Sequence, residues 1–159
     1  MELLKKVNNN IVRSDEVKEM MIREAAFYYG KFLNSMGFAW VADPQTKDTP
    51  MRVAKAWIND LIEGSMNPEP KINTFPNDEG YTGLLCQTAI PVDSMCAHHN
   101  LTFKGVAHIA YIPGKEEDSK IMGLSKFNRV VEWFAHRPQI QESLTMQIHS
   151  YLDQICIGN

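Results

Sequence analysis

Apolar residues recur at helical spacing in two segments of the first half of the chain. In residues 14–36 they predict one amphipathic helix, with Ser14 as its N-cap and Gly37 in a left-handed turn after its end. The face predicted to point inward carries Val17, Met20, Met21, Ala25, Tyr28, Phe32 and Met36. A second helix is predicted from Thr49–Pro50, an N-cap followed by a proline in the first turn, to the residue before Gly64. Its inward face carries Val53, Ala54, Trp57, Ile58, Leu61 and Ile62.

Two later segments, about residues 84–93 and 103–112, show the composition and alternation typical of β-strands. In the second of them one face carries Val106, His108, Ala110 and Ile112, and the opposite face carries Ala107, Ile109 and Tyr111. Residues 65–82 are rich in Pro, Gly, Asn and Asp and show no period, which predicts an irregular connection before the strands. Residues 114–120 predict a charged loop after them.

Two further helices are predicted after this loop. The first has Ser125 at or near its N-cap and ends near Arg137–Pro138, because proline disfavours the helical conformation in the residue before it. Its inward residues are Phe127, Val130, Val131 and Phe134. The second is predicted to start at Pro138 and to end at Gly158, with Ile140, Leu144, Ile148, Leu152 and Ile155 turned inward. The sequence thus predicts one α+β domain, with an N-terminal helical region (1–64) and a core (83–159).

Composition places the chain of 159 residues among ordinary globular proteins. Hydrophobic residues make up 44% and charged residues 22%, which argues against intrinsic disorder. No apolar run approaches the length of a bilayer span, and the N-terminus lacks the apolar core of a secretory signal. We therefore expect no membrane association and a cytoplasmic location. The net charge of −3 offers no general attraction to nucleic acid, so a polyanionic ligand would need locally gathered positive charge.

The sequence Cys96-Ala97-His98-His99 is the first candidate for chemistry. Cys96 and His99 are separated by two residues, a spacing that lets a thiolate and an imidazole bind the same Zn²⁺. His98 would remain beside the metal as an imidazole that titrates near neutral pH and transfers protons. The alternative is a turn with a buried thiol and a surface histidine, which is the more frequent outcome for an isolated pair of this kind.

A second candidate is the group Ser125, Lys126 and Arg129 near the start of a predicted helix, where unpaired backbone N–H groups favour an anion. A lysine in the first turn opposes the helix dipole, so a bound anion would account for it. The alternative is a solvated helix face. Arg52 and Lys55, in the second predicted helix, would by themselves be surface cations.

Gln141 and Glu142 lie in the first turn of the last predicted helix, where an acidic side chain is favoured by the helix dipole without any function. The functional alternative is that a fixed carboxylate accepts two hydrogen bonds from a guanine-like N1–H and exocyclic amino group. Few other ligands present that pair of donors.

Several of these segments occur together in the order found in one enzyme family. They are Thr49-Pro50-Met51-Arg52-Val53-Ala54-Lys55, Cys96-Ala97-His98-His99, Ala110-Tyr111-Ile112-Pro113, Gly123-Leu124-Ser125-Lys126 and Arg137-Pro138-Gln139-Ile140-Gln141-Glu142. From about Ser14 to its end, the chain closely resembles the type I GTP cyclohydrolases. That family converts GTP and water to 7,8-dihydroneopterin triphosphate and formate, the first step of tetrahydrofolate and related pterin biosynthesis.

The resemblance implies a role for each candidate residue. Cys96 and His99 would be the ligands of a Zn²⁺ cofactor, and His98 would be the proton-transfer residue. Triphosphate or guanine contacts are implied for Ser125, Lys126, Arg129, Gln141 and Glu142, with Arg52 and Lys55 as weaker candidates. The resemblance also implies a T-fold, an antiparallel sheet with two long helices on one face. Pentamers stacked as a decamer are expected, with GTP bound in active sites between subunits.

The resemblance has two departures. Family members continue past the last helix into two strands that supply a second cysteine ligand, a further histidine and an arginine, whereas this sequence ends at Asn159. Neither other thiol is expected to replace that ligand, because Cys86 lies about 33 Å along an extended strand from Cys96 and Cys156 lies at the far end of the last helix. We therefore interpret the chain as an incomplete copy. Ala97 replaces a commonly acidic residue, which we expect to matter little.

Two alternatives to GTP turnover remain at this point. The chain could be a catalytically incomplete subunit or fragment that binds nucleotide or full-length partners without turnover. It could also be another T-fold enzyme that acts on a purine or a pterin, although the Ser125–Lys126 and Gln141–Glu142 contexts favour the GTP reaction.

Overall fold

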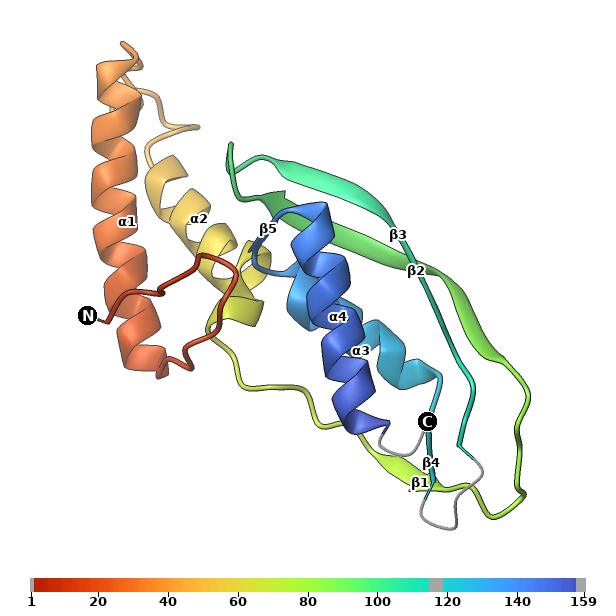
Figure 1. Ribbon diagram of the computed structural model, residues 1–159. Coiled ribbons are helices and arrows are strands. Elements are labelled where there is room, and N and C mark those ends of the chain that lie inside the picture. The colour runs from red at the N-terminus through yellow and green to blue at the C-terminus, as the bar shows by residue number, and fades with distance from the viewer. Residues whose placement is uncertain (1, 115–118, 157–159) are drawn as a thin grey trace.

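The computed structural model of the protein describes residues 2–114 and 119–156. In chain order the main elements are α1 (Asp15–Ser35), α2 (Thr49–Ala56), β2 (Leu85–Cys96), β3 (Thr102–Tyr111), α3 (Ser125–Ala135) and α4 (Gln141–Ile155). Strands β2 and β3 form a long antiparallel pair, and α3 and α4 cover one face of it (Figure 1). Helices α1 and α2 form a lobe beside one end of the pair. The predicted α+β class is confirmed.

Five short elements complete the described chain. They are the π-helical turn η1 (Trp57–Leu61), the 3₁₀ turn η2 (Glu63–Ser65), β1 (Thr74–Pro76), β4 (Lys120–Met122) and β5 (Pro138–Gln139). β1 pairs antiparallel with β4, although the sequence predicted irregular chain at both places. The prediction was wrong because strands of three residues are too short to show an alternating pattern. None of the described helices combines the length and hydrophobicity needed to cross a bilayer.

Helix α1 has the predicted ends but not the predicted inward face. The hydroxyl of Ser14 accepts a hydrogen bond from the N–H of Val17 at 3.4 Å, and Gly37 has a φ of 82°. The buried residues are Ile22, Ala26, Gly30 and Leu33, whereas Met20, Tyr28, Phe32 and Met36, predicted inward, are exposed. Apolar residues lie on more than one face of α1, and α2 covers only one of these faces. Periodicity alone therefore could not predict which face would be buried.

Helix α2 is shorter than predicted. Thr49 is its first helical residue and Asp48 occupies the N-cap position, one residue earlier than expected. The α-helix ends at Ala56 and continues as η1, in which the N–H of Ile62 donates to the carbonyl of Trp57 at 2.9 Å. No periodic pattern marks this change, because a single π turn of five residues is too short to show a period of its own.

The core confirms the predicted inward face of α3 and corrects the start of α4. Phe127, Val130, Val131 and Phe134 are all buried between α3 and the strands. Residues 138–139, predicted as the start of the last helix, instead form β5, which runs parallel to the end of β2. The carbonyl of Gln139 accepts a hydrogen bond from the N–H of Ala97 at 2.9 Å, so the extended conformation gains a partner that helix would not supply. The predicted end at Gly158 lies outside the described residues.

Strand β2 carries a bulge near its middle. Its pairing with β3 skips from Gln87 to Ile90, and Ala89 within this step has a φ of 57°. The backbone N–H of Ala89 donates to Nδ1 of His108 on β3 at 3.4 Å. A left-handed φ crowds the Cβ atom of any residue other than glycine, so the bulge holds Ala89 in a strained conformation.

Ala89→Gly is expected to raise the free energy of unfolding by about 1 kcal/mol, because it removes the crowded Cβ atom. Ala110→Gly is the matched control, at an exposed β3 position that pairs regularly with Cys86. The control should lose about 0.5–1 kcal/mol, the usual cost of glycine inside a strand. Urea denaturation of both variants measures whether the free energy of unfolding rises or falls in each. A loss of stability in Ala89→Gly would contradict the bulge geometry.

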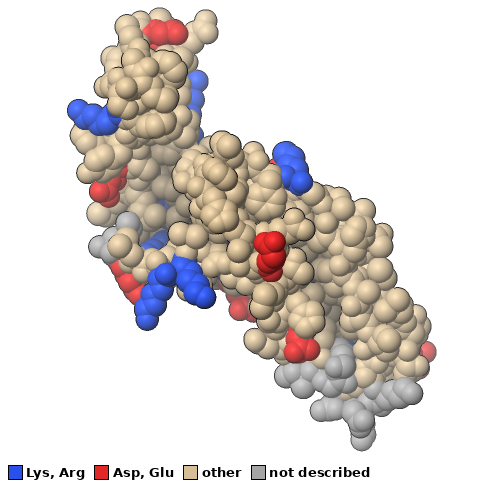
Figure 2. Space-filling view, turned by 45° about the horizontal axis from the view of Figure 1, so that its top comes forward, with Lys and Arg blue, Asp and Glu red and all other residues tan. Residues whose placement is uncertain are grey.

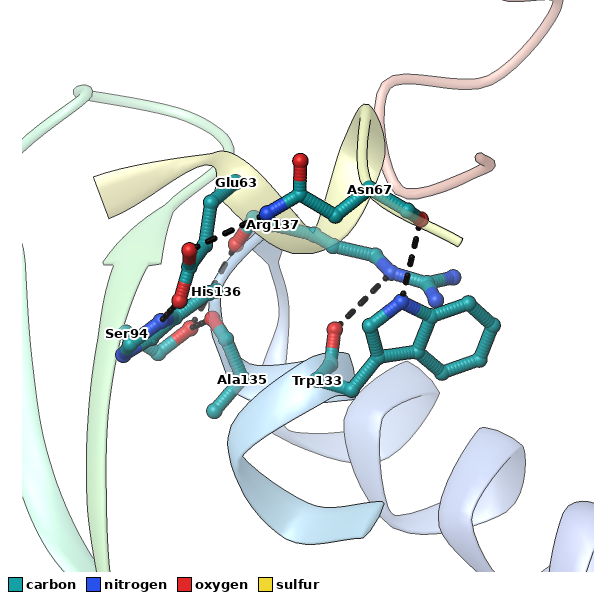
Figure 3. Close-up of polar contacts among 7 residues, drawn as sticks. All are labelled: Glu63, Asn67, Ser94, Trp133, Ala135, His136 and Arg137. Carbon is teal, nitrogen blue, oxygen red and sulfur yellow. Dashed lines mark hydrogen bonds and ion pairs between the residues drawn. The ribbon is translucent and has the colours of Figure 1, made fainter. Parts of the chain in front are cut away.

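A polar junction of Glu63, Asn67, Trp133 and His136 joins the segment after α2 to helix α3 (Figure 3). Glu63 Oε1 lies 3.0 Å from His136 Nδ1, and Glu63 Oε2 accepts a hydrogen bond from Asn67 Nδ2 at 3.1 Å. The indole N–H of Trp133 donates to the carbonyl of Asn67 at 3.3 Å. These contacts fix the segment that follows the helical lobe against the carboxyl end of α3.

Arg137, directly after the junction, is a buried cation with 3% of its surface exposed. Its guanidinium stacks on the rings of Trp133 and Phe134, at 4.0 and 4.6 Å from their centres. Its Nε donates to the carbonyl of Trp133 at 3.2 Å (Figure 3). Burial lowers the pKa of Arg137 to about 10, which leaves the side chain charged at neutral pH.

Candidate functional site

The loop that holds the candidate metal ligands is short and firmly closed. Cys96 is the last residue of β2, and its N–H donates to the carbonyl of Leu101 at 2.8 Å. Its carbonyl accepts from the N–H of Asn100 at 2.8 Å, and Asn100 takes the left-handed conformation that returns the chain, with a φ of 55°. The side chains of His98 and His99 are therefore carried on a tight turn at the tip of the hairpin.

The structure brings the two predicted metal ligands, Cys96 and His99, close together. Cys96 Sγ lies 3.5 Å from His99 Nδ1 and 4.0 Å from His98 Nδ1. A tetrahedral Zn²⁺ bonded to sulfur and nitrogen would hold these two atoms about 3.6 Å apart, so the Cys96–His99 pair fits the metal. Hydrogen bonding to His99, with smaller effects from the backbone N–H groups of His98 and His99, lowers the pKa of the Cys96 thiol to about 6. The thiolate, which is the form that binds metals, thus dominates at neutral pH.

The pair is not a complete catalytic zinc site by itself. Such sites use three protein ligands and an open position, and no group of three or more His, Cys, Asp or Glu side chains in the described residues lies close enough to hold a metal ion. Cys86 lies at the opposite end of β2, and Cys156 is a core residue at the carboxyl end of α4. As expected from the sequence, neither thiol reaches Cys96.

An apolar groove adjoins the hairpin tip. It has a volume of about 790 Å³ and lies between α1, α2 and residues 99–101. Tyr28, Phe32 and Trp57 line it opposite His99. Two of these aromatic residues were predicted to be core residues of α1, and the structure shows them instead as a wall beside the candidate metal site. This role becomes apparent only from the packing of α1 and α2 beside the hairpin tip, three segments that are distant in sequence.

Gln141 and Glu142 lie near the same end of the sheet. Because β5 pairs with Met95 and Cys96, the helix that begins two residues after Gln139 starts beside the metal pair. Gln141 lines a cleft of about 300 Å³ between α4 and β3, and Glu142 is exposed in the first turn of α4. The structure thus brings the guanine candidates and the metal candidates to one end of the core.

The candidate triphosphate residues lie along α3, and only the first two of them are at its far end. Ser125 and Lys126 are in the first turn of α3, and the helix rises about 15 Å from there to Ala135, which is bonded to β2 close to Cys96. Arg129 faces a separate cavity of about 210 Å³ that it shares with Glu63 and Glu132. Within one chain, Ser125 and Lys126 are therefore separated from the Cys96 pair by the length of α3, whereas Arg129 lies six residues, about 9 Å of rise, before Ala135.

Arg52 and Lys55 occupy the exposed side of α2. Arg52 Nη2 pairs with the carboxylate of Asp48 at 3.4 Å, an exposed contact that contributes little stability. On the face shown in Figure 2, basic side chains stand apart or in pairs among mostly uncharged residues. Among the described residues on that face, a single chain thus presents no extended basic surface, and a triphosphate would require cations brought together from several elements.

Sequence reasoning missed two residues that support the site, Ser94 and Gln139. They are 1% and 0% exposed. The hydroxyl of Ser94 donates to the carbonyl of Ala135 at 2.6 Å (Figure 3), and Gln139 Nε2 donates to the carbonyl of Phe134 at 2.8 Å. Each polar group binds the backbone of α3, which no periodic pattern indicates. The available signal was position, since Gln139 lies within the motif at 137–142 and Ser94 lies two residues before Cys96.

Comparisons with known proteins place the chain in one family. The sequence model of GTP cyclohydrolase I matches residues 28–158. Proteins named GTP cyclohydrolase 1 are 46% identical over 110 residues in Flavobacterium johnsoniae, 40% over 109 residues in Aeromonas hydrophila and 41% over 109 residues in a Shewanella species. Each match covers 68% of this chain and 47–49% of the relative, so the chain spans about half the length of the curated relatives it matches. The chain therefore belongs to the GTP cyclohydrolase I family.

Proposed function

We propose that the chain is a subunit of a Zn²⁺-dependent GTP cyclohydrolase I, which hydrolyses GTP to 7,8-dihydroneopterin triphosphate and formate in tetrahydrofolate and pterin biosynthesis. The observation that carries the proposal is the convergence of Cys96 Sγ and His99 Nδ1 at 3.5 Å in a member of this family. When bound, Zn²⁺ would supply Lewis-acid activation of water at neutral pH. The strand pair with α3 and α4 would form the first half of a T-fold.

The proposed roles of the other residues at this end follow from their chemistry. His98 is exposed beside the ligand pair and would transfer protons as the imidazole ring of the substrate opens. Glu142 would accept hydrogen bonds from the guanine N1–H and amino group, with Gln141 beside it in the cleft against β3. Cys96 and His99 would hold the metal.

The separation of the cations supports an active site built between subunits. Ser125, Lys126 and Arg129 would bind the triphosphate of a GTP molecule whose guanine lies at the Cys96 end of another copy, because within one chain the rise of α3 places Ser125 and Lys126 about 15 Å, and Arg129 about 9 Å, from Ala135 at that end. Arg52 and Lys55 would add positive charge at the edge of that site. A pentamer or decamer is the assembly that we propose, with β3 as an exposed edge strand of the described sheet.

The proposal is tested by adding GTP to zinc-loaded protein and following pterin fluorescence together with formate release. The assay is run with the chain alone and with a full-length relative whose own zinc-binding cysteine has been replaced. Turnover in either sample that disappears with Cys96→Ser supports the proposal. Absence of turnover in both samples, with zinc bound, contradicts it.

A second candidate function is a catalytically incomplete subunit that binds nucleotide or full-length partners without turnover. The observation that favours it is the ligand set within the described residues, where a pair falls short of the three ligands that a catalytic zinc site uses. Native mass measurement of the mixed sample separates the two functions, since this candidate predicts mixed assemblies that bind GTP without releasing formate.

A further inference from the structure

We propose that Asn8 is a positioning residue for the Cys96 loop. Asn8 belongs to an N-terminal strap, residues 8–13, which precedes α1 and lies outside the part of the chain that the family model matches. The significance of the loop rests on the proposed function, whereas the contact itself and its test do not depend on turnover.

The strap runs across the segment that links the helical lobe to the core. Asn10 Nδ2 donates to the carbonyls of Gly64 and Asn67, at 2.9 Å in both cases. The backbone N–H groups of Ile11 and Arg13 donate to the carbonyls of Ser65 and Met66, also at 2.9 Å. These four bonds fix the path of the strap, so that Asn8 lies in a defined position between α3 and α4.

At that place Asn8 meets two buried polar side chains. Its Nδ2 donates to Gln139 Oε1 at 3.3 Å, and its carbonyl accepts from Arg137 Nη1 at 3.2 Å. The same carbonyl accepts from Gln147 Nε2 at 3.3 Å. Gln139 and Arg137 are 0% and 3% exposed, so water cannot readily replace these partners. Removing a partner from a buried polar group costs more than the bond itself contributed.

Gln139 transmits this contact to the metal pair. As part of β5 it lies alongside Cys96, and its carbonyl accepts the hydrogen bond from the N–H of Ala97. The pairing of β5 with β2 involves only two residues on each strand, so few hydrogen bonds besides this one hold the two strands in register. Gln141, two residues further, begins α4. The side chain of Asn8 therefore supports both the ligand loop and the first turn of the helix that carries the guanine candidates.

Native-state amide hydrogen exchange of Asn8→Ala tests the proposal, with Asn9→Ala as the matched control. Asn9 lies next to Asn8 on the exposed side of the strap, so its replacement leaves the Gln139 contact intact. Asn8→Ala is expected to accelerate exchange at the N–H of Ala97 about tenfold, because Gln139 Oε1 loses its donor. Amides in the buried middle of α3 should change less than about twofold, and Asn9→Ala should leave Ala97 unchanged.

Equal acceleration at Ala97 and throughout α3 would overturn the proposal, since it would show a general loss of stability. Unchanged exchange at Ala97 would overturn it as well. Asn8→Ser, which keeps a shorter hydroxyl donor, gives a milder second variant if Asn8→Ala reduces the folded population. Exchange is measured without GTP or added metal, so a failure of the proposed enzymatic function would leave this result decisive.

Discussion

Gly64→Ala is expected to lower the free energy of unfolding by about 3 kcal/mol or more, because the substitution forces atoms into occupied space. A Cβ atom at Gly64 would lie 2.0 Å from the carbonyl oxygen of Trp133 and 2.9 Å from that of His136. Both oxygens belong to the backbone at the end of α3, so rotating a side chain cannot relieve the contact. The helical lobe would have to separate from the core along the polar junction.

Gly105→Ala provides the matched control for this substitution. Gly105 lies on β3, and a Cβ atom there would meet nothing within 4 Å. We expect Gly105→Ala to change the free energy of unfolding by no more than about 0.5–1 kcal/mol. The expected direction is an increase, because glycine weakens strands. Urea denaturation followed by tryptophan fluorescence measures both variants. A loss below about 1 kcal/mol in Gly64→Ala would show that η2 does not pack directly on α3.

Local signals were sufficient where one element has one clear partner. Val130 and Val131 lie on the predicted inward face of α3, and the strands cover that face completely. Ser14 was identified as an N-cap because capping involves only bonds to the next turn. The Cys96–His99 pair was predictable for the same reason, since its geometry is set by a turn of a few residues.

Contacts between distant segments could not be predicted in this way. Tyr28 and Phe32 have the same hydrophobicity whether they enter the core or line the groove beside His99, and the choice depends on where α2 and the hairpin tip lie. Gln139 forms a strand because an edge of β2 is available to it, although the preceding Pro138 resembles a helix start. In both examples the segment that packs against the residue, rather than the local sequence, decides the conformation or the burial.

The same limit applies to the composition of the site. The sequence grouped the anion candidates with the metal candidates through family resemblance, whereas the fold places Ser125 at the opposite end of α3 from Cys96. Residue type and order in the sequence do not encode this separation, because it depends on the direction in which α3 runs over the sheet. The proposed site shared by two copies would reconcile the resemblance with this separation.

Cys96→Ser is expected to weaken Zn²⁺ binding by about a hundredfold or more, because losing a direct ligand should exceed the 10–100-fold cost typical of losing a residue that supports one. The serine hydroxyl is not ionised at neutral pH, whereas the pKa of the Cys96 thiol is lowered to about 6 by its neighbours, with His99 first among them. Competition with a chromophoric chelator at constant ionic strength measures the affinity. His99→Ala should produce a loss of the same order.

Cys86→Ser is the control that decides whether the metal is held by the hairpin tip. Cys86 is an exposed thiol on the same strand, at the end remote from His99, so its replacement should change zinc affinity less than about threefold. Equal losses in Cys86→Ser and Cys96→Ser would indicate nonspecific binding by exposed thiols. Full affinity in Cys96→Ser would remove the ligand pair from the site, and with it the physical basis for the proposed hydrolysis of GTP.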